Sequence, residues 1–182
     1  MREMRRLFAL AGTLTAALVV TTEAHADDDW AFLPVFRIAL GPAIHVAPER
    51  EKHVELGLDL TAGFAAMPTE SFAGPIVNPE LGYSFDSLGI HAFNLTCGVG
   101  FGTPLAALLY HPRLIVGTLD GEAAVGMRNS LTFHALADLG SIEIGHQFVS
   151  IDGELHHDIR VMFGVNPLGF VYIVSAATDF LR

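Results

Sequence analysis

The chain has 182 residues, with 20 acidic and 10 basic side chains and a formal net charge of −10. This length suits a single domain. The acidic balance disfavours nucleic acid as a partner, because phosphate backbones are bound by basic patches. Cys97 is the only cysteine, so an intrachain disulfide is excluded.

The N-terminus has the three parts of a secretory signal. Three arginines precede a 14-residue apolar run, Leu7–Val20, and Ala24-His25-Ala26 forms an A-x-A cleavage site. The run is too short for a spanning helix, which needs about 20 residues. We therefore expect residues 1–26 to be a cleaved signal peptide and residues 27–182 to form one exported domain. Removal of the signal leaves a net charge of −11.

The segment His53–Phe64 alternates without an error for twelve residues. Its even positions are all apolar, whereas its odd positions are polar or glycine. A period of two is the signature of a β-strand with two different faces. No segment after the signal has 18 consecutive apolar residues, so we expect no spanning helix.

Further segments repeat this alternation, and short turn sequences such as Asp120-Gly121 and Asp152-Gly153 separate several of them. Short connections of this kind join antiparallel neighbours. The stretch Thr103–Leu139 is ambiguous, since residues near 130–138 suit either a short helix or a strand. The sequence predicts about eight strands, with a range of eight to ten. The other candidate strands are Val35–Val46, Asn78–Phe85, Ala92–Gly102, Arg113–Thr118, Ser141–Ser150, Asp158–Asn166 and Gly169–Ala176.

Amphipathic strands occur both in soluble barrels, with the apolar face inward, and in outer-membrane barrels, with the apolar face toward lipid. Strands of 9–12 residues match the length that crosses a bilayer at a tilt. Lys52 is the only lysine after the signal, whereas a water-facing sheet surface usually carries many. We therefore predict an all-β fold, a closed antiparallel up-and-down transmembrane β-barrel. The polar faces would then line its lumen.

On these alternating segments and the signal Met1–Ala26, the chain resembles the small, eight-stranded, OmpA-like outer-membrane barrels. The resemblance implies location in the outer membrane of a Gram-negative bacterium, contact with outer-membrane lipid, and insertion by the barrel-assembly machinery. It also implies a final strand that ends in an aromatic residue. Here Gly169, Tyr172 and Val174 have a suitable spacing, although the chain continues to Arg182.

An eight-stranded barrel is only wide enough for side chains to fill it. Charges enclosed there must pair, because an unpaired buried charge is costly. We expect a structural network of salt bridges and predict that Leu58→Arg blocks assembly, whereas Asp59→Asn is far milder. The predicted lumen residues are Glu55, Asp59, Glu80, Arg113, Arg128, Glu143, Asp158 and Arg160.

Two chemical alternatives remain open. Some barrels of the resembling class modify lipid A with a His/Ser pair and a carboxylate, and His146, Ser150 and Glu154 form the nearest trio here. His146 and Ser150 are about 13 Å apart by strand rise, too far for a nucleophile–base pair. His156 and Asp158 share a strand face, but no second pair has a metal-like spacing.

We therefore expect no catalytic, metal or cofactor site and a structural or interaction role at the envelope, with no open pore. The alternatives are a lipid A-modifying enzyme and a soluble periplasmic barrel that binds an apolar ligand. The sequence leaves the oligomeric state open.

Overall fold

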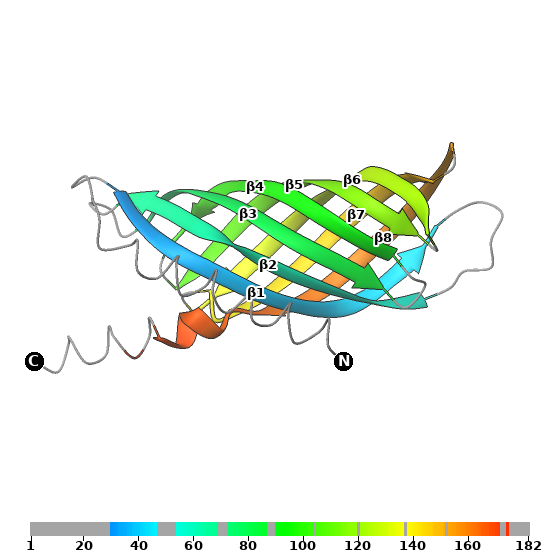
Figure 1. The fold of residues 1–182 in the computed structure, drawn as a ribbon. Coiled ribbons are helices and arrows are strands. Elements are labelled where there is room, and N and C mark those ends of the chain that lie inside the picture. The colour runs from blue at the N-terminus through cyan, green and yellow to red at the C-terminus, as the bar shows by residue number, and fades with distance from the viewer. Residues whose placement is uncertain are drawn as a thin grey trace, which may run out of the picture.

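The computed structural model describes residues 30–46, 54–68, 73–86, 90–103, 105–119, 121–136, 138–151, 153–171 and 174. The predicted signal peptide, residues 1–26, lies outside these ranges. The described residues form eight antiparallel strands that close into one barrel, as the sequence predicts (Figure 1). The strands are β1 (Trp30–His45), β2 (Val54–Pro68), β3 (Gly74–Asp86), β4 (Ile90–Gly102), β5 (Ala106–Leu119), β6 (Glu122–Ala135), β7 (Gly140–Ile151) and β8 (Glu154–Val165).

The topology is a simple meander in which every strand pairs with its sequence neighbours. The barrel closes where β1 pairs with β8, in a register that places Ile38 opposite Val165 and Ile44 opposite Ile159. Closure pairs residues 38–45 of β1 with β8, so this part of the sheet has no open edge. One end of the barrel, here called the Trp30 end, holds the start of β1 and the end of β8. The opposite end is called the His45 end.

Two of the predicted tight turns connect strands at the His45 end. Gly121 lies between β5 and β6 with φ of 92°, and Gly153 lies between β7 and β8 with φ of 83°. This left-handed region is open to glycine at little steric cost. The Asp-Gly pairs therefore mark the hairpins that the sequence predicts.

The ambiguous stretch Thr103–Leu139 is mostly strand. β5 begins at Ala106, and β6 continues through Ala135. The alternative of a short helix near 130–138 is therefore wrong. Leu131 and Phe133 point outward between buried Ser130, Thr132 and His134. This period of two, with ladder partners on both β5 and β7, holds the segment extended.

The last predicted strand, Gly169–Ala176, is not a strand in its described part, because residues 167–171 are helical. Pro167 has no N–H to continue a ladder and suits the first position of a helix. Asn166 caps this helix: its Oδ1 accepts a hydrogen bond from the backbone N–H of Leu168 at 3.1 Å. Within the described residues, no helix is long and apolar enough to cross a membrane.

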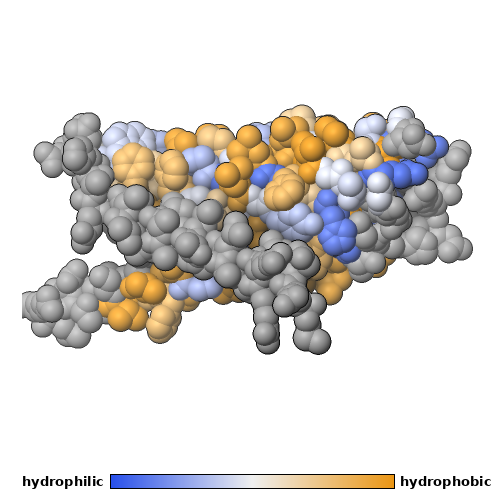
Figure 2. All heavy atoms as spheres, in the orientation of Figure 1, coloured by the Kyte–Doolittle hydropathy of each residue, from blue (hydrophilic) through white to orange (hydrophobic). Residues whose placement is uncertain are grey.

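The outer surface of the barrel carries large apolar side chains. Phe93 is 71% exposed, Leu81 64% and Ile144 58%. Figure 2 shows hydrophobic residues over the middle of the face in view and hydrophilic residues gathered toward the His45 end. Leu56, Leu58 and Leu60 alternate with buried Glu55, Gly57, Asp59 and Thr61, so the apolar face of β2 points outward.

Candidate functional site in the barrel interior

The inward faces of the strands bring charged side chains together along the barrel axis. All eight residues predicted for the lumen are buried there, each with at most 6% of its surface exposed. They come from β2, β3, β5, β6, β7 and β8, because each lies on the inward parity of its strand. The structure thus places residues far apart in sequence in one enclosed space.

The centre of this interior is built around Asp59. Its Oδ2 accepts a hydrogen bond from Nη1 of Arg113 at 2.6 Å and another from Nη1 of Arg128. Arg113 also donates through Nη2 to Glu143 at 3.2 Å, and Glu143 lies 3.6 Å from Arg128. Gln147 accepts from Nε and Nη2 of Arg128 at 3.0 and 2.9 Å. Two arginines and two carboxylates therefore balance one another in a buried cluster.

Two further ion pairs flank the central cluster. Arg37 donates through both terminal nitrogens to Glu80, at 2.9 and 3.4 Å. Nη2 of Arg160 donates to Oδ2 of Asp86 at 2.9 Å. The predictions included Glu80 and Arg160 but missed their partners. Both partners follow the same alternation. Assigning Arg37 to the inward face of β1 would have found the partner of Glu80. Extending the β3 strand by one residue beyond Phe85 would have found Asp86, the partner of Arg160.

A histidine cluster lies near the His45 end. His45 pairs through Nδ1 with Asp158, and the rings of His45 and His156 stack with centroids 5.8 Å apart. Gln147 links Asp158 to the central cluster by a hydrogen bond of 3.2 Å. His157 points to the other face, as the alternation requires. The described residues contain no group of three or more His, Cys, Asp or Glu side chains arranged to hold a metal ion.

Inward glycines make room for the largest interior side chains. A Cβ added at Gly98 would lie 2.1 Å from ring atoms of His111, and one added at Gly164 would lie 2.9 Å from Cδ of Arg37. Both distances are below the closest approach of real Cβ atoms. Small residues opposite large ones are what a narrow, filled barrel requires. This explains why glycine occurs inside alternating segments.

Apolar clusters occupy the interior at both ends. At the His45 end they are Ile90, Ala92 and Ile115, and Ala124, Val149 and Ile151. At the Trp30 end the cluster is Ile76, Ala107 and Leu109. The central cluster of Asp59, Arg113, Arg128 and Glu143 therefore lies between two apolar layers.

In the trio proposed for lipid A chemistry, His146 and Ser150 are exposed on the outer face of β7, whereas Glu154 is an exposed first residue of β8 on the parity of buried His156. His146 contacts His157, with ring nitrogens 3.4 Å apart and ring centroids 5.5 Å apart. Within the described residues, no hydrogen bond joins His146 to Ser150 or Glu154. The structure therefore does not bring this trio together as a catalytic set.

Polar groups on the outer face pair with one another. Tyr83 and His91 interact at 3.2 Å, and the hydroxyl of Tyr110 donates to Asn129 at 2.6 Å. His91 lies next to the first residue of β4, but His146 lies in the middle of β7. Pairing lowers the cost of placing such groups on an apolar surface.

In comparisons with known proteins, no protein-family model, no curated protein and no solved structure matches the chain.

Proposed function

We propose that this chain is a bacterial outer-membrane β-barrel protein with a structural or interaction role at the cell envelope. The observation that carries the proposal is the inverted distribution of side chains. Outward residues from β3, β4, β7 and β8, such as Leu81, Phe93, Ile144 and Phe163, are each more than half exposed, whereas the interior is charged. A soluble protein of this size rarely exposes such an extended apolar surface.

The strand lengths agree with this proposal. The strands contain 12 to 16 residues, whereas strands in soluble proteins average about 5–6. About 9–11 tilted residues cross the hydrocarbon core, which leaves residues at both ends for the interfaces. The N-terminal signal supplies the route of export, and we expect insertion by the barrel-assembly machinery.

The interior supports a closed barrel rather than an open pore. Arg113, Arg128 and Asp59 fill its centre, and each is at most 2% exposed. Together with Glu143 they balance one another's charge, so that paired side chains occupy the centre of the lumen. We therefore propose that the protein acts through the barrel wall and its exposed surfaces. Solutes would not pass through the lumen.

Neither alternative has comparable support. A soluble barrel that binds an apolar ligand would place Leu56, Leu58 and Leu60 inside and Glu55 and Asp59 outside, which is the reverse of the observed arrangement. A lipid A-modifying enzyme needs its nucleophile and base within about 3 Å, and His146 contacts His157 instead of Ser150.

The test is to express the full chain in a Gram-negative host and separate its envelope fractions. The proposal predicts recovery in the outer membrane and faster gel migration before boiling than after boiling. Lipid A from the same cells should keep the mass spectrum of control cells. Recovery in the periplasmic extract would contradict the membrane location. A mass change that is lost in His146→Ala would instead support the enzyme.

A further inference from the structure

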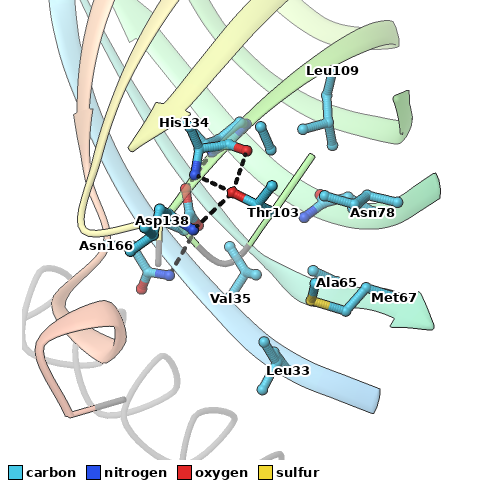
Figure 3. A pocket seen from close by; sticks show the side chains of 14 residues that line it. Leu33, Val35, Ala65, Met67, Asn78, Thr103, Leu109, His134, Asp138 and Asn166 are labelled. Atoms are coloured by element: carbon cyan, nitrogen blue, oxygen red, sulfur yellow. Dashed lines mark hydrogen bonds and ion pairs between the residues drawn. The ribbon is translucent and has the colours of Figure 1, made fainter. Parts of the chain in front are cut away.

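The Trp30 end of the barrel contains a cavity of about 150 Å³ (Figure 3). Its wall is mostly apolar and includes Val35, Met67, Ile76 and Leu109. Leu105 at the rim is 61% exposed, whereas Leu109 is 2% exposed. The cavity therefore runs from the mouth of the barrel toward its interior.

Polar side chains line part of the same cavity. Nδ1 of His134 pairs with Asp138, and Nδ2 of Asn166 donates to the other carboxylate oxygen of Asp138 at 3.0 Å. These contacts orient the imidazole so that Nδ1 donates its hydrogen bond to Asp138, and in that tautomer Nε2 is an acceptor. Figure 3 shows His134, Asp138 and Asn166 on one side of the cavity and Asn78 on another.

Two of these polar groups have no partner. Nε2 of His134 and Oδ1 of Asn78 are buried and form no hydrogen bond among the described residues. The two side chains are only 5% and 3% exposed. An unsatisfied buried acceptor costs about 1–3 kcal/mol, which a bound group that donates a hydrogen bond would recover.

The charges near the cavity select a neutral donor. Arg37 lies 3.8 Å from Asp138 and also pairs with Glu80, so the carboxylates there already face a cation. The guanidinium of Arg37 would repel a bound cation. A bound anion would be repelled by the two acceptor atoms, Nε2 of His134 and Oδ1 of Asn78. An uncharged hydroxyl avoids both penalties and donates one hydrogen bond.

We propose that this cavity binds a small neutral molecule with an apolar body and one hydroxyl, of the phenol or short-chain alcohol class. The volume suits a body of this size, since apolar cavities of about 150 Å³ accommodate benzene. The hydroxyl donates to His134 or Asn78 while the body packs against Met67 and Leu109. The site goes beyond the proposed envelope role and depends on the barrel rather than on its location.

The methionines supply a built-in test. Met67 lines the cavity, Met162 is buried elsewhere in the interior, and Met127 is exposed on the outer face. The protein is labelled with methyl-¹³C methionine and titrated with phenol or with toluene, which has a similar shape but no hydroxyl. Methyl NMR spectra are recorded in phospholipid nanodiscs, or in buffer if the barrel is recovered in soluble form. Failure to enter nanodiscs thus counts against the membrane proposal alone.

The expected result is a saturable shift of the Met67 methyl signal, with the Met162 signal unmoved. Phenol should bind at least tenfold more tightly than toluene. A shift of Met127 alone would show partition into lipid and would overturn the proposal. Equal affinity for the two probes, or no shift of Met67 with either, would also overturn it.

Matched variants locate the site. Leu109→Trp fills the cavity and should abolish the Met67 response, whereas Leu108→Trp on the outward face should preserve it. Ala107→Phe serves the same purpose if Leu109→Trp does not fold. His134→Leu or Asn78→Leu should remove the preference for phenol but keep toluene binding. If both polar variants keep the preference, or if filling the cavity leaves the response intact, the assignment is wrong.

Discussion

Arg113 reaches across the barrel interior to Asp59, 54 positions away in the sequence, and donates a hydrogen bond of 2.6 Å to its Oδ2. The same oxygen accepts from Arg128. One carboxylate oxygen thus bridges two buried guanidinium groups, and Glu143 supplies the second negative charge. This contact links β2, β5 and β6 through the lumen.

The first prediction concerns the loss of this shared charge. Asp59→Asn leaves Arg113 and Arg128 with Glu143 as the one carboxylate within 4 Å among the described residues, so the barrel should lose about 3–5 kcal/mol of its free energy of unfolding. The loss of stability is measured by urea unfolding, with the folded fraction followed by its heat-modifiable gel migration. Glu55→Gln is the matched control and should have a small effect, because Oε1 of Glu55 has no hydrogen-bond partner among the described residues. Equal effects of the two changes would contradict a central role for Asp59.

This expectation replaces the one drawn from sequence, which held Asp59→Asn to be far milder than Leu58→Arg, because the structure joins both arginines to Asp59. Alternation correctly placed Asp59 on the polar face of β2. It carries no information about partners on other strands, since Arg113 and Arg128 meet Asp59 only after the barrel closes. Sequence alone therefore identified which residues face inward but not which one connects the others.

The second prediction concerns the outer face. Leu58→Arg should destabilise the inserted barrel by about 2–4 kcal/mol, because a charge on the lipid face is costly near the midplane. Thr118→Arg, also exposed but one residue from the end of β5, should cost about 0–1 kcal/mol. The yield of heat-modifiable protein in the outer-membrane fraction measures both. Similar yields for the two variants would argue against a lipid-facing surface.

The third prediction concerns the fit between Gly98 and His111. Gly98→Ala would bring a methyl group to 2.1 Å from the imidazole, so the free energy of unfolding should fall by about 1–3 kcal/mol. Adding His111→Ala should recover part of that loss, because it removes the clash. A double-mutant cycle of urea midpoints tests the coupling. Additive effects would show that the two positions do not compete for space.

The fourth prediction concerns the β6–β7 connection. Burial acts to raise the pKa of Asp138, but the hydrogen bond from His134 and the charge of Arg37 outweigh it and hold the pKa below its ordinary value. A carboxyl with a lowered folded pKa stabilises the fold above its unfolded pKa, and this contribution is lost as the pH falls through the folded pKa. Asp138→Asn should therefore be less stable than the wild type at pH 7.

The difference between these two proteins should shrink once the pH falls below about 4, the ordinary carboxyl value. Urea midpoints of both proteins from pH 7 to pH 2 provide the measurement. A difference that stays constant over this range would mean that the ionised carboxylate contributes nothing.

The sequence predicted seven of the strands, all but β6, and the Asp-Gly hairpins, because both depend on local signals. His53–Phe64 alternates in the chain itself, and Gly121 and Gly153 have positive φ where the turns require it. The segment near 130–138 was ambiguous because its residues suit a helix cap as well as a strand. Pairing with both β5 and β7 makes the segment a strand, and this pairing depends on residues outside the segment.

The C-terminal segment shows the opposite error. Alternation around Gly169 suggested a strand, but the ladder is already complete once β8 pairs with β1. Asn166 and Pro167 carried the correct signal, since an Asn cap followed by proline begins a helix. The cavity at the Trp30 end was not predictable, because its wall combines residues from five strands, two turns and the helix cap Asn166.

The central claim is that the outward faces of the strands contact lipid tails, and tryptophan quenching tests it most directly. Trp30 is the only tryptophan, so Trp30→Phe combined with Leu95→Trp places one probe on the outward face of β4, where Leu95 is 54% exposed. The account predicts strong quenching by phosphatidylcholine brominated in mid-chain and little quenching by aqueous acrylamide. Strong quenching by acrylamide together with none by the brominated lipid would contradict it.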